Sequence, residues 1–210
     1  MIYLHVQSLD QIVGEAPTIA RRRMDESQRA ELRLYQRSLI AQVTGQTTEQ
    51  LQIEANDFGK PILKFPNQFQ FNQSHSQQSY VMAISDEIAN IGVDIEDLNR
   101  QVRFEALAKH AFHPEEMKVW KALNYDRAFW FKVWTSKEAV LKAHGLGIRL
   151  SLNTLNTHAH PTWDFGVVEH ELLGSFYYQN IVMPYAMLTV AYPNPHQTRS
   201  SDSIQKIKWF

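Results

Sequence analysis

The sequence contains no cysteine among its 210 residues, which excludes disulfide bonds, thiolate metal ligands and a catalytic thiol. It also has no run of about 18 consecutive apolar residues, so no transmembrane helix is expected. Residues 1–10 carry no basic leader, and polar residues interrupt their apolar ones, which is unlike a signal peptide. We therefore expect a cytoplasmic protein whose chemistry needs no thiol.

The chain also lacks an excess of charge of either sign. Its 21 basic and 22 acidic residues give a net charge of −1, so no bulk attraction to nucleic acid or to an anionic membrane is expected. The composition, with 44% hydrophobic and 11% aromatic residues, is that of a globular protein with a sizeable core. At about 150 residues per domain, the length allows one large domain or two small ones.

Hydrophobic periodicity and turn residues predict a mixture of helices and strands. Helices are expected over residues 25–44, 102–111, 114–123 and 126–144, the first beginning at Asp25 and ending at Gly45. Strands are expected over residues 1–7, 80–85, 91–95, 163–169, 176–182 and 187–191. Residues 58–72 read as a loop with short extended pieces, and residues after 193 as a polar tail as far as residue 204.

A faint internal repeat relates the two parts of the chain. Residues 37–45 (RSLIAQVTG) match residues 137–145 (KEAVLKAHG), and residues 80–84 (YVMAI) match residues 185–189 (YAMLT). In each part, a helix that ends in glycine precedes a Tyr-x-Met strand. Short matches of this kind also arise by chance, so chance and duplication both remain open. A duplication would give two similar halves with a cleft between them, where ligands tend to bind.

Two carboxylates stand out in residues 92–96 (GVDIE). On a strand, Asp94 and Glu96 project from one face while Val93 and Ile95 face the core. With Cα atoms about 7 Å apart, two such carboxylates can converge on one divalent cation. A lone pair of this kind is more typical of two solvated acids at a strand end.

The helix predicted over residues 126–144 combines charged and apolar residues. Trp134, Glu138 and Lys142 recur every four residues and so share one face, and Lys137 lies between them in the sequence. Glutamate and lysine one turn apart often form a plain surface pair, but the flanking residues are too apolar for a freely solvated helix. Metal and phosphate would satisfy charges of both signs, as would structural partners, and both interpretations remain open.

Basic residues recur along the first predicted helix. Arg29, Arg33 and Arg37 follow each other every four residues, after three arginines at residues 21–23. Like charges at this spacing slightly destabilise a helix, so the row favours an anionic partner. Glutamates of the same helix can also neutralise part of it, and the two interpretations are equally compatible with the sequence.

A further group of donors precedes the strand at residue 80. Ser74 and His75 lie in the segment FNQSHS, and Lys60 lies upstream in GKP. All three side chains can donate hydrogen bonds to phosphate oxygens. Adjacent serine and histidine do not make a catalytic triad, because triads assemble in space. His110 and His113 lack a clear third ligand, so no zinc site is expected.

Taken together and in this order, the motifs resemble those of the phosphopantetheinyl transferases, most closely the larger, pseudo-dimeric, surfactin-synthetase-activating type. The similarity runs from about residue 29 to residue 147. The matching stretches are residues 58–61 (FGKP), 71–76 (FNQSHS), 92–96 (GVDIE), 112–116 (FHPEE) and 134–142 (WTSKEAVLK), followed by Gly145 and Gly147.

The resemblance implies an α+β fold of two similar α/β halves in a pseudo-twofold arrangement. We expect residues 1–95 to form an N-terminal half that contacts the nucleotide of coenzyme A, and residues 96–210 a C-terminal half with the metal and the catalytic helix. The implied reaction is that of a holo-[acyl-carrier-protein] synthase. It transfers 4'-phosphopantetheine from coenzyme A to a serine of an acyl or peptidyl carrier protein and releases adenosine 3',5'-bisphosphate.

The resemblance also implies roles for individual residues. Asp94, Glu96 and Glu138 resemble the carboxylates that hold Mg²⁺ against the pyrophosphate of coenzyme A, and oxygen ligands are what this cation takes. Glu138 is also the candidate base for the incoming serine. Lys142 resembles the lysine that neutralises the pyrophosphate, and Lys137 is expected to support the same site.

The remaining implied contacts are to the nucleotide. Ser74 and His75 resemble the pair that contacts its phosphates, while Lys60 and Arg37 resemble contacts to its 3'-phosphate end. Two alternatives compete with a transferase: a non-catalytic module that binds coenzyme A or a carrier protein, and a nucleic-acid-binding protein that uses the arginine row. The near-zero net charge speaks against nucleic acid. We expect a monomer with no membrane or nucleic-acid partner.

Overall fold

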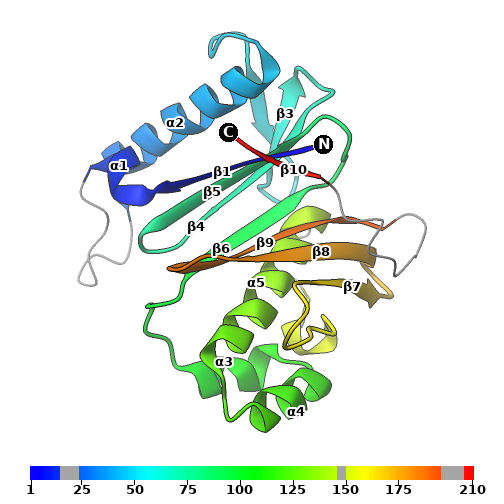
Figure 1. The fold of residues 1–210 in the computed structure, drawn as a ribbon. Coiled ribbons are helices and arrows are strands. Elements are labelled where there is room, and N and C mark those ends of the chain that lie inside the picture. Colours follow the sequence, from blue (N-terminus) through cyan, green and yellow to red (C-terminus); the bar gives the residue numbers. More distant parts are fainter. Residues whose placement is uncertain (15–23, 146–149, 195–205) are drawn as a thin grey trace.

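Two four-stranded sheets stack face to face between two layers of helices (Figure 1). The computed structural model describes residues 1–14, 24–145, 150–194 and 206–210. In the first sheet the strand order is β10 (Ile207–Trp209), β1 (Ile2–Ser8), β5 (Ser79–Ser85) and β4 (Gln70–His75). In the second sheet it is β6 (Gly92–Asp97), β9 (Ala186–Pro193), β8 (Gly174–Val182) and β7 (Phe165–His170).

Helices cover the outer face of each sheet. α1 (Leu9–Val13) and α2 (Glu26–Thr44) lie over the first sheet, and α5 (Arg127–His144) lies over the second (Figure 1). A small hairpin of β2 (Gln52–Ala55) and β3 (Pro61–Phe65) follows α2, while α3 (Phe104–Ala111), α4 (Pro114–Ala122) and the 3-10 turn Leu152–Thr154 pack near α5. None of the helices in the described ranges is long and apolar enough to cross a lipid bilayer.

The ends of α2 and α5 follow from their capping residues. The Asp25 side chain accepts a hydrogen bond from the Gln28 backbone, and Gln28 returns one to the Asp25 backbone, which completes a capping box. Gly45 and Gly145 adopt left-handed conformations, with φ of 71° and 85°, and end the two helices. The predicted beginning and end of the first helix are therefore confirmed.

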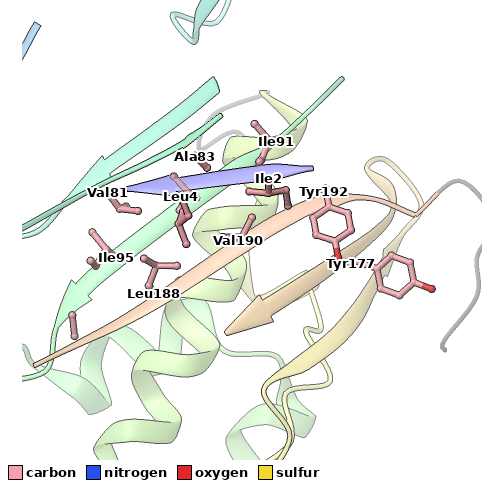
Figure 2. Close-up of a cluster of buried hydrophobic side chains, with 12 residues drawn as sticks. Ile2, Leu4, Val81, Ala83, Ile91, Ile95, Tyr177, Leu188, Val190 and Tyr192 are labelled. Atoms are coloured by element: carbon pink, nitrogen blue, oxygen red, sulfur yellow. The ribbon is translucent and has the colours of Figure 1, made fainter. Parts of the chain in front are cut away.

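Alternation along the strands builds the layers. On β5, Val81 and Ala83 point to the second sheet, whereas Tyr80, Met82 and Ile84 point to α2. Figure 2 shows the resulting inter-sheet cluster. Its buried members from both sheets are Ile2, Leu4, Val81, Ala83, Ile91, Val93, Ile95, Tyr177, Ala186, Leu188, Val190 and Tyr192.

The two halves repeat one topology, which confirms the predicted α+β fold class. In the first sheet, β5 lies between β1 and β4 and pairs antiparallel with both. In the second sheet, β9 lies between β6 and β8 and pairs antiparallel with both. The matching segments of the internal repeat end α2 and α5 and lie in or at β5 and β9. Tyr80 is buried but Tyr185 is 53% exposed, so the repeat is one of backbone more than of side-chain environment.

The structure also departs from the predicted elements. Residues 70–72 belong to β4 and not to a loop, because they pair antiparallel with residues 83–85 of β5. β10 lies beyond the predicted polar tail, where no strand is predicted, and pairs with β1 in parallel. The predicted boundary at residue 95 falls inside β6, and the division into residues 1–95 and 96–210 stays a prediction. Gly147 and the arginines at residues 21–23 lie outside the described residues.

Candidate active site

Helix α5 is buried along most of its length except for one polar stripe. From Phe129 to Ala143, every side chain is buried apart from Trp134, Glu138 and Lys142, which are partly exposed. These are the three residues that the four-residue spacing places on one face. Trp134 stacks on Trp130, with ring centroids 5.2 Å apart. The predicted common face is confirmed, and it borders the two carboxylates of β6.

A glycine brings α5 against β6. A Cβ atom added to Gly92 would overlap the carbonyl oxygen of Ala139 and the backbone nitrogen of Ala143. Helix backbone and strand backbone therefore lie in direct contact, which a larger residue would prevent. The contact atoms belong to the residues that directly follow Glu138 and Lys142 along α5, so both of these residues lie beside the point where α5 touches β6.

Asp94 lies on the face of β6 that points to α5. It is 5% exposed, and its Oδ1 accepts hydrogen bonds from Ser74 Oγ at 2.8 Å and from Lys142 Nζ at 2.6 Å. Its Oδ2 is buried and has no hydrogen-bond partner in the described part of the chain. A buried carboxylate oxygen without a partner is energetically costly unless a cation or water satisfies it.

Glu96 shares this face of β6 but has both oxygens engaged. Its Oε2 accepts from Ser76 Oγ at 2.8 Å, and its Oε1 pairs with Arg100 Nη1 at 2.5 Å. Burial raises the pKa of Glu96, as does the charge of Asp94, while Arg100 and Ser76 act in the opposite direction. The predicted projection of Asp94 and Glu96 from one face is confirmed, and neither is a solvated strand end.

Glu138 completes the acidic group from the helix side. Burial raises the pKa of its carboxyl to about 7, the negative charges of Asp94 and Glu96 add to the rise, and Lys142 opposes it. A carboxyl that titrates near neutral pH can take or give a proton under physiological conditions.

Strand β4 and the residue that follows it join the two sheets through alternate polar side chains, which we call the polar seam: Asn72, Ser74 and Ser76. Asn72 Oδ1 accepts from the backbone N–H of Val93 at 2.9 Å, and the two serines donate to the carboxylates of β6. The seam connects an edge strand of the first sheet to an edge strand of the second. It therefore makes the N-terminal half part of the candidate site.

A pocket of about 330 Å³ opens beside the seam and Lys142. Its lining comprises Pro61, Phe71, Asn72, Gln73, Ser74, His75 and Lys142. The ring of His75 reaches solvent, yet the atoms packed around it lower the pKa of its imidazole, and the charge of Lys142 acts in the same direction. The structure thus brings Ser74, His75 and Lys142 together, as the family resemblance implies.

The residues present fit a hard divalent cation, although the ligands are not yet gathered. Among the described residues, no three carboxylate or imidazole side chains already converge as a bound metal requires. Asp94 nevertheless has an unpartnered buried oxygen, and burial together with the charges of Asp94 and Glu96 raises the pKa of Glu138. A divalent cation would relieve both, and Mg²⁺ takes one or two carboxylates and completes its shell with phosphate oxygens and water.

The structure does not bring three predicted site residues to this group. Lys137 points to the opposite side of α5, where its Nζ pairs with Glu116 Oε2 at 2.7 Å and donates to the carbonyls of Leu152 and Leu155. Lys137 is fully buried there. Its burial is possible because this set of acceptors compensates the loss of water around the ammonium. Its predicted support of the site is therefore indirect, through the position of α5.

Lys60 and Arg37 are likewise occupied by backbone carbonyls. Lys60 Nζ donates to Ile91 O at 3.2 Å and Ala143 O at 3.1 Å, and burial lowers its pKa to about 8. Arg37 Nη2 donates to Thr48 O at 2.5 Å and Leu51 O at 2.8 Å. Both side chains tie structural elements together, and neither lines the pocket.

Two arginines of the row, Arg29 and Arg33, have an acidic partner within α2. Both are exposed and pair with Glu26, at 3.2 Å and 3.5 Å. One carboxylate neutralises part of this charge, at the small energies typical of surface pairs, and an anionic partner for the row stays a prediction.

Several polar residues of the site region escape prediction from sequence. Glu116 is 2% exposed and accepts from Thr157 as well as pairing with Lys137. Ser76 and Arg100 hold Glu96. The alternation of polar residues in FNQSHS is the one sequence signal that points to Ser76. Nothing in the spacing of Arg100 or Glu116 identifies a partner.

Comparison with known proteins matches this region to a family. Residues 90–187 fit the family model of the 4'-phosphopantetheinyl transferase superfamily. The chain is 33% identical over 121 residues to the 4'-phosphopantetheinyl transferase gsp of Aneurinibacillus migulanus. The aligned region covers 56% of this chain and 48% of that protein. The chain is 36% identical over 117 residues to the 4'-phosphopantetheinyl transferase HetI of a Nostoc species, covering 53% and 49%.

A third relative is the 4'-phosphopantetheinyl transferase psf-1 of Bacillus pumilus, 32% identical over 120 residues, or 56% of this chain and 50% of that protein. The chain thus spans about half the length of the curated relatives it matches. The matched region holds β6 and α5, with the three carboxylates and Lys142. Residues 90–187 of this chain are therefore similar to the 4'-phosphopantetheinyl transferase superfamily.

Proposed function

We propose that this chain transfers the 4'-phosphopantetheine group from coenzyme A to a serine hydroxyl of an acyl or peptidyl carrier protein, as a holo-[acyl-carrier-protein] synthase does. Adenosine 3',5'-bisphosphate is the other product. The names of the relatives support the reaction class. The observation that carries the proposal is the buried Oδ2 of Asp94, which has no partner among the described residues. Lys142 is hydrogen-bonded to the other oxygen of this carboxylate, and the charge of Asp94 helps to raise the pKa of Glu138, which burial raises most.

The proposed cation is Mg²⁺, held by Asp94 and Glu138 with Glu96 beside them. When bound, it would neutralise charge on the pyrophosphate oxygens and so favour attack at phosphorus. Lys142 is already hydrogen-bonded to Asp94 and lines the pocket. We assign its ammonium to a pyrophosphate oxygen, where a point charge suits phosphate.

The protons and bonds of the proposed step balance. The serine oxygen of the carrier forms a bond to the phosphorus that bears pantetheine, and the bond from that phosphorus to the bridging oxygen breaks. The bisphosphate leaves with the electron pair. We assign Glu138 to accept the serine proton through a water, because a carboxylate that also holds a cation is a weaker base than a free one.

Ser74 and His75 are proposed to donate to the nucleotide phosphates from the other wall of the pocket. The lowered pKa of His75 keeps its imidazole neutral near pH 7, so it would contribute a hydrogen bond without a charge. Localisation in the cytoplasm and a monomeric state complete the proposal.

The test is to incubate the protein with coenzyme A, Mg²⁺ and a panel of apo carrier proteins. Mass spectrometry should show that a carrier gains one phosphopantetheine group. Glu138→Gln should lower the rate by at least about a hundredfold, since a positioned base contributes roughly 10²–10⁴-fold. Glu105→Gln, which changes an exposed glutamate of α3, is the control and should keep the activity. A folded protein that binds coenzyme A and modifies no carrier would identify a binding module instead.

A further inference from the structure

A group of polar side chains lies buried between α5 and the second sheet. Asp94, Thr189 and Asn180 face one another in register on β6, β9 and β8, so all three project from the face that α5 covers. Thr189 is fully buried and Asn180 is 3% exposed. On α5, the hydroxyls of Thr135 and Ser136 are fully buried as well. We call Asn180, Thr189, Thr135 and Ser136 the polar row.

The hydrogen bonds of the polar row run in one direction, from the sheet to the helix. Asn180 Nδ2 donates to Ser136 Oγ at 2.9 Å and to Thr189 Oγ1 at 2.7 Å. The hydroxyls of Thr135 and Ser136 donate to carbonyls of the preceding turn of α5. Because each hydroxyl has one proton, Thr189 is the donor in its 2.7 Å contact with Thr135. The sheet therefore binds α5 through two hydroxyls whose own protons are already used.

Stability alone does not account for these residues. Asn180 Oδ1 is buried and has no hydrogen-bond partner in the described ranges, a cost that an apolar side chain would avoid. Apolar contacts are also non-directional and let a helix slide on a sheet, whereas hydrogen bonds weaken steeply with distance and angle. The contact at Gly92 sets how closely α5 approaches β6. The polar row restricts where along the sheet α5 lies.

We propose that Thr189 and Asn180 are positioning residues, which fix α5 along its axis and with it the place of Glu138 relative to Asp94. This inference rests on the proposed function. Thr135 lies within one turn of Glu138 on the same continuous helix, so a shift of α5 at the polar row displaces the Glu138 backbone by the same amount. None of the four residues of the row lines the pocket assigned to coenzyme A. The row therefore acts on the rate of transfer and not on the binding of coenzyme A.

The experiment separates rate from stability with two variants of Thr189. Thr189→Val keeps the shape of the side chain and removes the hydroxyl, while Asn180 keeps Ser136 as an acceptor. We expect kcat for transfer to a carrier protein to fall about tenfold, with the KM for coenzyme A within about twofold and the thermal midpoint no lower than in the wild type. Thr189→Ser keeps the hydroxyl but loses a buried methyl, so it should lower the thermal midpoint and keep kcat within about twofold.

The matched control is Ser85→Ala, which removes another fully buried hydroxyl, one that donates to Met1 O in the first sheet. It should lower the thermal midpoint and leave kcat unchanged. If the polar row were only structural, the rate would follow the stability of each variant. Wild-type kcat in Thr189→Val, or an equal loss of kcat in Thr189→Ser, would therefore overturn the inference.

Crystal structures of the wild type and of Thr189→Val test the inference without any activity. In the variant, α5 should move along its axis against β6 by about 0.5 Å or more, the tolerance within which catalytic groups have to be held. A wild-type protein that modifies no carrier would remove the proposed function, and an α5 that keeps its place in the variant would remove this inference. If Thr189→Val does not fold, Thr135→Val removes the same hydrogen bond from the helix side.

Discussion

At the scale of single residues, Glu138 combines burial with the repulsion of two neighbouring carboxylates. Its pKa rises from 4.5 to about 7, so the folded protein favours the protonated form. A raised pKa means that the stability associated with this group is fully present below pH 4.5 and is lost as the pH rises through about 7. The charged form that a cation would bind is therefore the form that destabilises the metal-free fold.

We expect Glu138→Gln to stabilise the metal-free protein at pH 8 by on the order of 1 kcal/mol, and to have little effect at pH 4.5. Urea unfolding in the presence of a chelator at both pH values measures the difference. Glu105→Gln, in an exposed position, serves as control. An equal effect of Glu138→Gln at both pH values would show that its carboxyl titrates normally.

At the scale of elements, the contact between β6 and α5 depends on one missing side chain. Gly92→Ala should destabilise the protein by about 3 kcal/mol or more, since the added methyl overlaps helix backbone that cannot rotate away. Gly59→Ala provides the comparison, because nothing lies within 4 Å of its added Cβ and only its φ of 83° is unfavourable. Its expected cost is about 1 kcal/mol. Similar urea midpoints for the two variants would contradict the close contact.

The packing of α4 on α5 depends on the buried pair of Lys137 and Glu116. Burial lowers the pKa of Lys137, and the negative charge of Glu116 opposes that shift. Lys137→Met leaves Glu116 charged and unpaired in the interior and should cost about 3–5 kcal/mol in the free energy of unfolding.

Adding Glu116→Gln to Lys137→Met should restore at least half of that loss, because the amide still accepts from Thr157 and carries no charge. Denaturant unfolding of the two single variants and the double variant gives the coupling. Additive losses would show that the two side chains do not act as a pair.

At the scale of the whole molecule, the cluster between the sheets joins the two halves. It draws side chains from β1 and β5 on one side and from β6, β8 and β9 on the other (Figure 2). Without the other half, each half would expose the apolar inner face of its sheet to water. The halves are therefore expected to unfold together, in contrast to independent domains.

Leu4→Ala, in the first sheet, should lower stability by about 3 kcal/mol, as is usual for a fully buried leucine. Far-UV circular dichroism follows both halves, while tryptophan fluorescence reports mainly on Trp120, Trp130, Trp134 and Trp163 of the second. Both signals should shift by the same amount. The control is Leu34→Ala, where the side chain is 67% exposed and the effect should stay within about 0.5 kcal/mol. Two separate transitions would contradict joint unfolding.

Sequence periodicity was sufficient to predict a mixture of helices and strands and the shared face of Trp134, Glu138 and Lys142, because the periods of strands and helices determine where side chains point. The α+β fold class of two similar halves was implied by the family resemblance. The same helical period places Lys137 about 140° from Lys142, which already separates it from the site. Lys60 and Arg37 could not be placed, since a long cationic side chain reaches backbone carbonyls as readily as phosphate. The pairs of Arg100 with Glu96 and of Glu116 with Lys137 depend on turns and tertiary packing, which local patterns do not encode.

The missing side chain at Gly92 has a consequence for how the pocket can change shape. Because β6 and α5 touch backbone to backbone, the carboxylates of Asp94 and Glu138 belong to one rigid body. The opposite wall belongs to β3 and β4, which meet β6 through side-chain hydrogen bonds such as that of Ser74 to Asp94. A bulky substrate would therefore enter by displacing the β4 wall, and the spacing between the backbones that carry Asp94 and Glu138 would stay constant while the pocket widens.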